Sequence, residues 1–402
     1  QVGRPLLPKY PGKQRILMKN WVDECNKTHE CMWHKTSAYM PTRVIDVGKG
    51  SLRLVETRNK IMNDYIALSH CWGILTKEER FCTYSNNIEA LKRSIPYDSL
   101  PKSFQHAVDV TRLLGVQYLW IDSLCIIQED KQDWELEAAK MEDIFSSAYC
   151  TIAACSAASS LDGFLGKRNS KISFKLQTSR GPRYLIEPID NFQEDVEQSV
   201  LSKRGWVLQE RALSRRTIYF TSNQMYWECG EGIFCETLAT LHNSVSQFLS
   251  DSDFPNYALS HYKNDRIQLT QHLYQLYSTL HLTNVTDRPK AILGLQNRLA
   301  RTFQSRADYG VIWIYLERTL LWQAESPRTM SRISYQECSR VPSWSWMAYT
   351  GAIKYMNIPF QQVHWTQNIR SPFGAKDHDS GQDSTENHNA EWDSHLHAAA
   401  SE

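Results

Sequence analysis

The sequence predicts an α/β protein in which helices flank a mainly parallel β-sheet. Three short apolar runs, at residues 65–68, 117–121 and 148–154, have the continuous hydrophobic character of strands that are buried on both faces. Between them lie two stretches with apolar residues at helical spacing, one at 101–114 and one that starts with Asp133 as its expected cap. This compact strand, helix, strand order favours right-handed parallel crossovers, with ligands bound beyond the carboxyl ends of the strands.

Composition limits the class of protein. The 402 residues, 42% of them hydrophobic, can bury one large core or two moderate ones. Lys and Arg total 45 against 44 for Asp and Glu, so the charge gives no reason to expect nucleic acid or an anionic membrane as a partner. No apolar run approaches the roughly 20 residues that span a bilayer. The expected partners are therefore small molecules or proteins.

The cysteines and the start of the chain bear on location. Ten cysteines are scattered along the sequence without the dense framework of small secreted domains, which predicts reduced thiols and a cytoplasmic protein. The first residues have no signal-peptide pattern. The chain begins with Gln1 instead of Met, which suggests a fragment of a longer precursor.

Four segments are predicted along the chain. Residues 1–60 form a proline-punctuated lead-in, and 61–220 form the α/β domain, with an insertion at 156–200 that is rich in Ser, Gly, Lys and Arg. Two further strands are expected at 217–220 and 224–228. Residues 221–365 read as an α-rich extension packed on the core, with helices at 287–303 and 311–322. Residues 366–402 have few apolar side chains and are predicted to be disordered.

The ends of the first two predicted strands carry the candidate ligand-binding residues. Ser69, His70, Trp72 and Gly73 follow the first strand, and Asp122 follows the second. Parallel strands bring these ends to one edge, where Trp72 could stack on a base and Asp122 could bind ribose hydroxyls. Packing of the loop and capping of the next turn are the alternatives. A hydrolase built on the adjacent Ser69 and His70 is not expected, because neighbouring side chains on a strand point in opposite directions.

Cys25, His29 and Cys31 have the residue types that zinc prefers. Their spacing matches no standard zinc finger, and a fourth ligand such as His34 would be needed. The sequence-based interpretation therefore assigns no metal and keeps these three as alternative candidates. Cys229 and Cys235 are interpreted as buried thiols.

Four strings resemble the heterokaryon incompatibility (HET) domain of filamentous fungi. They are YIALSHCWG (65–73), YLWIDSLCIIQ (118–128), EAAKMEDIFSSAY (137–149) and RGWVLQERALSRR (204–216), and their order matches the family. The flanking residues 41–43 and 341–346 fit as well. Ile127 stands where the family usually has Asn, which puts the role of that position in doubt. The resemblance implies non-self recognition and programmed cell death, as the effector part of a larger system.

HET domains are in turn distantly similar to TIR domains, which have a flavodoxin-like sheet and several of which cleave NAD between nicotinamide and ribose. The essential carboxylate of those enzymes lies in a Trp-Cys-Leu-x-Glu string, and residues 206–210 (WVLQE) have the same spacing. The resemblance implies Glu210 as the catalytic residue, because a fixed carboxylate can stabilise the positive charge that develops on the ribose. An ion pair of Glu210 with Arg204, Arg211 or Arg215 is the structural alternative, and Glu137 is the alternative catalytic candidate.

The predicted function is thus that of a TIR-like HET effector with NAD as a possible nucleotide substrate and no required cofactor. The alternative is a non-catalytic signalling module that associates with itself or docks to a partner protein. The position of Glu210 separates the two. A carboxylate in a pocket beside the loop at 69–73 favours the enzyme, whereas a carboxylate on an exposed helix face favours the module.

Overall fold

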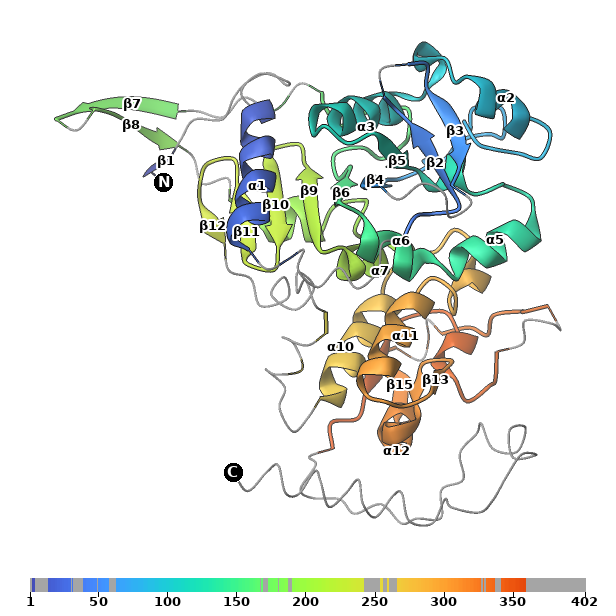
Figure 1. Cartoon of the computed structure of the whole chain (residues 1–402). Coiled ribbons are helices and arrows are strands. Elements are labelled where there is room, and N and C mark those ends of the chain that lie inside the picture. Colours follow the sequence, from blue (N-terminus) through green and yellow to red (C-terminus); the bar gives the residue numbers. More distant parts are fainter. Residues whose placement is uncertain are drawn as a thin grey trace.

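Four parallel strands form the centre of a nine-stranded sheet in the computed structural model (Figure 1). The structure describes residues 2–3, 14–29, 31, 39–48, 50–57, 63–166, 168, 173–179, 181–186, 190–241, 254–255, 259, 266–326, 328, 330–336 and 341–358. In sheet order the central strands are β5 (Tyr118–Trp120), β4 (Tyr65–Ser69), β6 (Cys150–Ala153) and β9 (Arg216–Phe220). β4 pairs in parallel with β5 and β6, and β6 with β9. The three strands predicted first are therefore neighbours, and the α/β class is confirmed.

The order of these four strands marks the edge where a ligand is expected. Numbered along the chain they run 2-1-3-4, which is the beginning of the flavodoxin-like order. The chain leaves β4 toward β5 and then crosses back to β6 on the other side of β4. In such sheets ligands bind beyond the carboxyl ends of the strands where the direction reverses, here the ends of β4 and β6.

Antiparallel strands extend the sheet on both sides. β2 (Arg43–Asp46) and β3 (Arg53–Glu56) follow β5, whereas β10 (Met225–Cys229), β11 (Gly232–Cys235) and β12 (Thr240–Leu241) follow β9. The strands predicted at 217–220 and 224–228 are confirmed as the antiparallel pair β9 and β10. The sheet thus reaches beyond both predicted boundaries of the α/β domain, into the lead-in and into residues 225–241.

Helices cover both faces of the sheet. α1 (Gln14–Thr28) and α3 (Lys102–Leu113) lie on one face, and α6 (Met141–Ser147) and α7 (Gly205–Leu213) lie on the other (Figure 1). Shorter helices are α2 (Ile88–Arg93), α4 (Asp122–Cys125) and α5 (Lys131–Ala138). The predicted stripe of α3 is buried, and the helix ends before Gly115, whose φ of +77° favours glycine. The cap of α5 is Asp130, one turn before the predicted Asp133, because the Asp130 side chain accepts from the Asp133 N–H.

Helix α7 is enclosed between the sheet and a C-terminal group of helices. Val207 packs in the apolar cluster with Tyr219 of β9 and Tyr226 of β10. Leu208 and Ala212 pack in a second cluster, formed mainly by α10 (Ile267–Ser278) and α11 (Leu293–Thr302). Because α7 is held on two sides, packing sets the direction of its remaining side chains.

The C-terminal part departs from the predicted helices. The helix expected at 287–303 begins only at Leu293, and the one expected at 311–322 is confirmed only in part, as a 3-10 turn at 313–315 followed by a short α-helix. There the chain forms the short pair β13 (Ala307–Asp308) and β14 (Val311–Ile312), then α12 (Leu316–Leu320), and β15 (Trp322–Ala324) pairs with β16 (Ile353–Tyr355). Tyr309 and Gly310, both with positive φ, form the turn between β13 and β14, so Val311 and Ile312 pair as a strand and the helix begins after them. The tail predicted at 366–402 lies outside the described residues.

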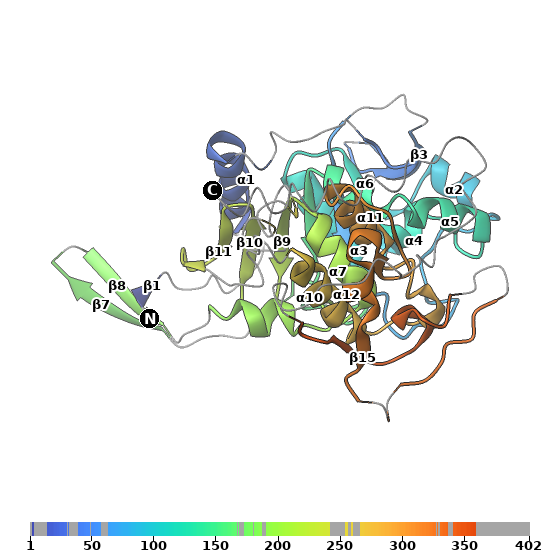
Figure 2. The same ribbon diagram turned by 90° about the horizontal axis from the view of Figure 1, so that it is seen from below.

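A three-stranded sheet, two of whose strands belong to the predicted insertion, projects from the body of the protein (Figures 1 and 2). It consists of β1 (Val2–Gly3), β8 (Gly181–Ile186) and β7 (Ser173–Thr178). Phe174 pairs across the hairpin with Leu185, and both side chains are exposed, as is Leu176. The projecting hairpin therefore presents apolar side chains to solvent.

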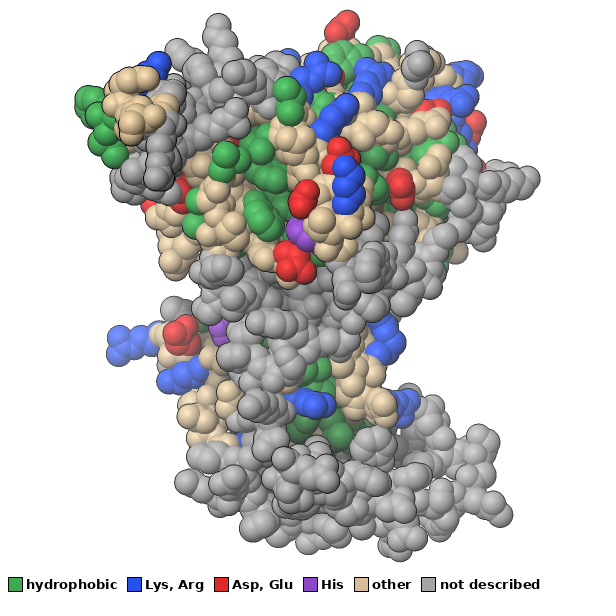
Figure 3. All heavy atoms as spheres, turned by 60° about the vertical axis from the view of Figure 1, so that its left-hand side comes forward, with side chains coloured by type: hydrophobic (Ala, Val, Ile, Leu, Met, Phe, Trp, Pro, Cys, Tyr) green, Lys and Arg blue, Asp and Glu red, His purple; other side chains and the backbone are tan. Residues whose placement is uncertain are grey.

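Acidic and basic side chains are interspersed on the face seen in Figure 3, so neither charge dominates there. This agrees with the nearly balanced composition. Within the described ranges, none of the helices combines the length and the apolar character needed to cross a bilayer.

Candidate functional site

A buried glutamate contacts the carboxyl end of the central strand. Ser69, the last residue of β4, donates its hydroxyl hydrogen to the carboxylate of Glu210, which projects from the middle of α7. Ser69 is 3% exposed and Glu210 is 8% exposed. Glu210 therefore lies beside the loop that follows β4, at the edge that the strand order marks, and not on an exposed helix face.

Burial controls the charge of Glu210. The loss of solvent raises the pKa of Glu210 from 4.5 to about 7, while the hydrogen bond from Ser69 and the positive charge of Arg204 act in the opposite direction. The negative charge of Asp122 adds to the rise. Both the protonated and the ionised form of Glu210 are therefore accessible near neutral pH. A carboxyl group with this pKa can act as an acid, a base or a fixed negative charge near pH 7.

His70 points to the opposite face of the sheet from Ser69. Its ring packs edge-on against Phe104 of α3, with 5.1 Å between the ring centroids. Burial lowers the pKa of His70 to about 4, so the imidazole is neutral. The alternation predicted for Ser69 and His70 is therefore confirmed, and the pair forms no nucleophile and base.

Trp72, Gly73 and Asp122 form a half-buried rim around this edge. The indole Nε1–H of Trp72 donates to Asp122 Oδ2 at 2.8 Å, and Asp122 Oδ1 accepts from the Ser123 N–H at 2.7 Å. Asp122 is the first residue of α4 and not its N-cap, so it binds the next backbone N–H without capping the helix, and it keeps 28% of its side chain exposed. Gly73 has a φ of +90°, and a Cβ there would lie 2.5 Å from Ser159 Oγ. The loop consequently packs tightly on the segment that follows β6.

Arg204 completes the rim and was not among the candidate ligand residues. It immediately precedes α7, and its guanidinium donates to the backbone carbonyl of His70. None of the three arginines expected as partners, Arg204, Arg211 and Arg215, forms an ion pair with Glu210 in the described structure. Arg211 instead pairs with Glu228 at 2.9 Å. A basic residue two positions before the WVLQE string is the sequence signal that could have identified Arg204.

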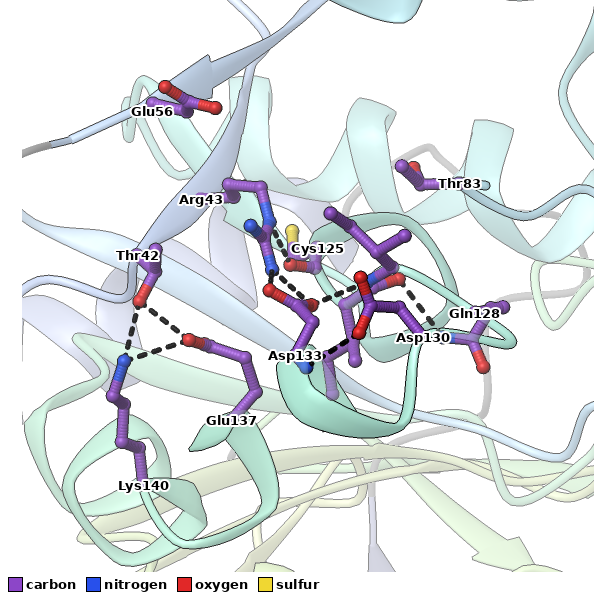
Figure 4. A network of polar contacts seen from close by, with 12 residues as sticks. Thr42, Arg43, Glu56, Thr83, Cys125, Gln128, Asp130, Asp133, Glu137 and Lys140 are labelled. Carbon is purple, nitrogen blue, oxygen red and sulfur yellow. Dashed lines mark hydrogen bonds and ion pairs between the residues drawn. The ribbon is translucent and has the colours of Figure 1, made fainter. Parts of the chain in front are cut away.

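Glu137, the alternative catalytic candidate, lies in a separate polar network (Figure 4). Its Oε1 accepts from Thr42 at 2.7 Å and pairs with Lys140 at 2.8 Å, and Lys140 also donates to Thr42 at 2.8 Å. These contacts fasten α5 to the residue before β2. The network pairs Glu137 Oε1 with protein groups, which supports a structural role, although Oε2 is buried without a hydrogen-bond partner in the described structure.

The same view shows how the loop at 122–128 is held (Figure 4). Arg43 Nε donates to the carbonyl of Cys125 at 2.7 Å, and Arg43 pairs with Asp133. Asp133 also accepts from the backbone N–H of Ile127 at 2.8 Å. Ile127, which stands where the family pattern has Asn, therefore contacts Asp133 through its backbone N–H and not through its side chain.

The candidate metal ligands lie elsewhere, at the end of α1. Cys25, His29 and Cys31 come together there with Cys229 of β10, and the fourth candidate His34 lies outside the described residues. The structure thus divides the predicted residues into two groups. Ser69, Trp72, Gly73 and Asp122 gather at one edge with Glu210, and the cysteine cluster is separate from them.

Fold and site together define an α/β domain whose parallel strands end at a buried glutamate. Residues 65–210 match the family model described as heterokaryon incompatibility protein (HET), and the chain therefore carries a HET domain. A segment of 90 residues is 33% identical to heterokaryon incompatibility protein 6, OR allele, of Neurospora crassa. That segment is 21% of this chain and spans only 13% of the relative. No solved structure matches the chain significantly, so the likeness to TIR domains stays a prediction.

Proposed function

We propose that this chain is part of an effector of fungal heterokaryon incompatibility and cell death, and that its HET domain cleaves NAD at the nicotinamide–ribose bond. The HET match and the name of the Neurospora relative support the role in incompatibility. The single observation that carries the proposed chemistry is the contact between Ser69 and Glu210. It joins a buried carboxylate to the carboxyl end of the central parallel strand, where sheets of this order bind ligands.

The proposed reaction breaks the bond between C1′ of the ribose and the nicotinamide nitrogen, and water supplies the oxygen that bonds to C1′. The products are nicotinamide, ADP-ribose and a proton. Positive charge develops on the ribose as nicotinamide leaves, and the Glu210 carboxylate stabilises it. Ser69 acts as a positioning residue, because its hydroxyl fixes the orientation of that carboxylate.

The rim offers contacts that suit the rest of the dinucleotide. Trp72 can stack on a base, and the exposed part of Asp122 can accept hydrogen bonds from ribose hydroxyls. Arg204 brings a positive charge to the same edge, which suits a pyrophosphate. Because Glu210 is only 8% exposed, the substrate must approach it through this rim.

Activity should depend on pH through Glu210. The pKa of this group is about 7, and the proposed role needs the ionised form. The rate at low NAD concentration should therefore rise with pH through about 7 and level off above it. A rate that falls across this range would mean that Glu210 acts in its protonated form.

The test is incubation of the purified protein with NAD, followed by chromatography of nicotinamide and ADP-ribose. Glu210→Gln should reduce the rate at least about a hundredfold, which corresponds to about 3 kcal/mol of barrier. Glu137→Gln is the matched control, because it neutralises another buried glutamate outside the site. Release of no nicotinamide by the wild type would reject the chemistry. Killing of a fungal host by the wild type, compared with Glu210→Gln, tests the link to cell death separately.

The second candidate, a non-catalytic module, is favoured by the projecting hairpin. Phe174, Leu176 and Leu185 expose 64%, 45% and 40% of their surface there, and exposed apolar groups often mark protein contacts. Light scattering of the wild type and of a serine variant with the changes Phe174→Ser, Leu176→Ser and Leu185→Ser tests self-association. An oligomer that the serine variant disrupts, in a protein without NAD cleavage, would favour the module. We place either activity in the cytoplasm, since none of the nine described cysteines forms a disulfide.

A further inference from the structure

Four potential metal ligands converge where α1 meets the end of β10. Cys25 lies in the last turn of α1, His29 and Cys31 follow that helix, and Cys229 is the last residue of β10. One ligand atom from each residue lies within 4.8 Å of all the others. His29 and Cys229 are 200 positions apart in the chain, with 3.5 Å between Nδ1 and Sγ. Tertiary folding alone brings the two segments together.

The spacing of these atoms suits a tetrahedral zinc ion. Zinc binds sulfur at about 2.3 Å and imidazole nitrogen at about 2.0 Å, so neighbouring ligand atoms around it are about 3.5 to 3.8 Å apart. The His29 to Cys229 distance falls at the lower end of this range. Three sulfur ligands and one nitrogen also select zinc over magnesium or calcium, which prefer oxygen.

The surroundings can balance the charge of such a site. Cys25 and Cys229 are fully buried, and Cys31 is 2% exposed. Zinc with three thiolates and a neutral imidazole carries one net negative charge, which needs compensation in a buried place. Arg216, itself 1% exposed, interacts with Cys25, and its Nη2 has no hydrogen-bond partner in the described structure. The positive guanidinium and the negative site would together be neutral.

The structure assigns to Cys25, His29, Cys31 and Cys229 a closed zinc site that fastens α1 and the residues after it to the sheet. Four protein ligands leave no open position for substrate, which is the pattern of a structural site. Phe234 of the neighbouring strand stacks on the His29 ring, with 6.2 Å between centroids, and orients it. The ion would thereby hold the amino-terminal helix against strands that lie far along the sequence.

Cys235 provides a matched control on the opposite face of the same strands. Residues alternate between faces, so Met225, Trp227 and Cys229 pack in the cluster that contains α1, whereas Tyr226 and Cys235 pack in the cluster beneath α7. Cys229 and Cys235 are equally buried thiols. Cys229→Ser and Cys235→Ser make the same chemical change, but only Cys229→Ser removes a proposed zinc ligand.

The experiment measures metal content in protein purified from zinc-supplemented cells without chelator. The wild type and Cys235→Ser should each hold about one zinc per chain, and Cys229→Ser should lose it. Replacement by cobalt should produce the strong visible absorption of a tetrahedral cobalt thiolate in the wild type and Cys235→Ser. A chelator should lower the melting temperature of these two proteins but leave Cys229→Ser unchanged.

Other results would overturn the assignment. Zinc that remains in Cys229→Ser at full occupancy places the metal elsewhere. A wild type without zinc, in which all ten cysteines react under denaturing conditions, leaves the cluster as plain thiols. A loss of two reactive thiols without reductant identifies a disulfide. If Cys229→Ser does not fold, His29→Ala, at a half-buried position after the helix, must weaken cobalt binding at least about a hundredfold.

Discussion

The unfolding free energy of Glu210→Gln, measured relative to that of the wild type, should be higher at alkaline pH than at acid pH. Burial raises the pKa of Glu210 from 4.5 to about 7, so the folded state binds more protons than the unfolded state between these values. The free energy of unfolding of the wild type therefore contains a term that falls as the pH rises through this window. The shift corresponds to about 3 kcal/mol. Glutamine keeps an acceptor for Ser69 and cannot ionise, so it lacks this term.

Urea unfolding, followed by tryptophan fluorescence, measures the effect in the wild type and in Glu210→Gln. The difference in unfolding free energy between the two proteins should grow by about 3 kcal/mol between about pH 4.5 and about pH 8. Subtraction removes the contributions of other groups, including His70, whose lowered pKa gives the opposite slope. Glu137→Gln is the control and should only destabilise, because it breaks the pair with Lys140.

A constant difference between Glu210→Gln and the wild type at all pH values would refute the argument. It would mean that solvent reaches the carboxylate in the folded protein and that burial exerts no cost on its charge. If the difference in unfolding free energy grows with pH and Glu210→Gln also loses NAD cleavage, the negative charge of Glu210 both destabilises the fold and supports the reaction. Such a conflict between stability and activity is common where a site holds a buried ionised group.

Four further changes have defined outcomes. The wild type should lose about 3 kcal/mol of unfolding free energy between about pH 6.5 and about 4, because the buried His70 imidazole must take up a proton, and His70→Gln should lack this loss. Identical pH dependences of the unfolding free energy in the two proteins would contradict this. Gly73→Ala should lower the unfolding free energy by about 2 kcal/mol through positive φ and the clash with Ser159, whereas Gly166→Ala, in open space, should not; equal melting temperatures would contradict the clash. Glu142→Gln should cost about 2 kcal/mol in urea unfolding, because Glu142 binds Arg298 and Arg301 across the contact between α6 and α11, and an unchanged midpoint would deny that contact a stabilising role. Deletion of residues 369–402 should leave the melting temperature nearly unchanged, and a drop of many degrees would show that the tail docks on the core.

Sequence alone determined the central sheet and the edge where the candidate site lies. The runs at 65–68, 117–121 and 148–154 are strands because a strand buried on both faces must be apolar along its whole length, and such runs are visible locally. Parallel crossovers then required Ser69 and Asp122 to end at one edge. The resemblance to HET and TIR domains, through the WVLQE string, pointed to Glu210 among 44 acidic residues, although the string could not tell which way its side chain points.

Only the tertiary structure decided which distant residues meet. It joined Glu210 to Ser69 across 141 positions by enclosing α7 between two apolar clusters, and it separated Glu137 from that edge by pairing it with Lys140. It added β2, β3, β11 and β12 to the sheet, since short outer strands are recruited by hydrogen bonding to a neighbour and have little pattern of their own. It also brought Cys229 to Cys25, His29 and Cys31. Spacing along a chain reports only local geometry, whereas contacts between segments far apart are set by the packing of the whole fold.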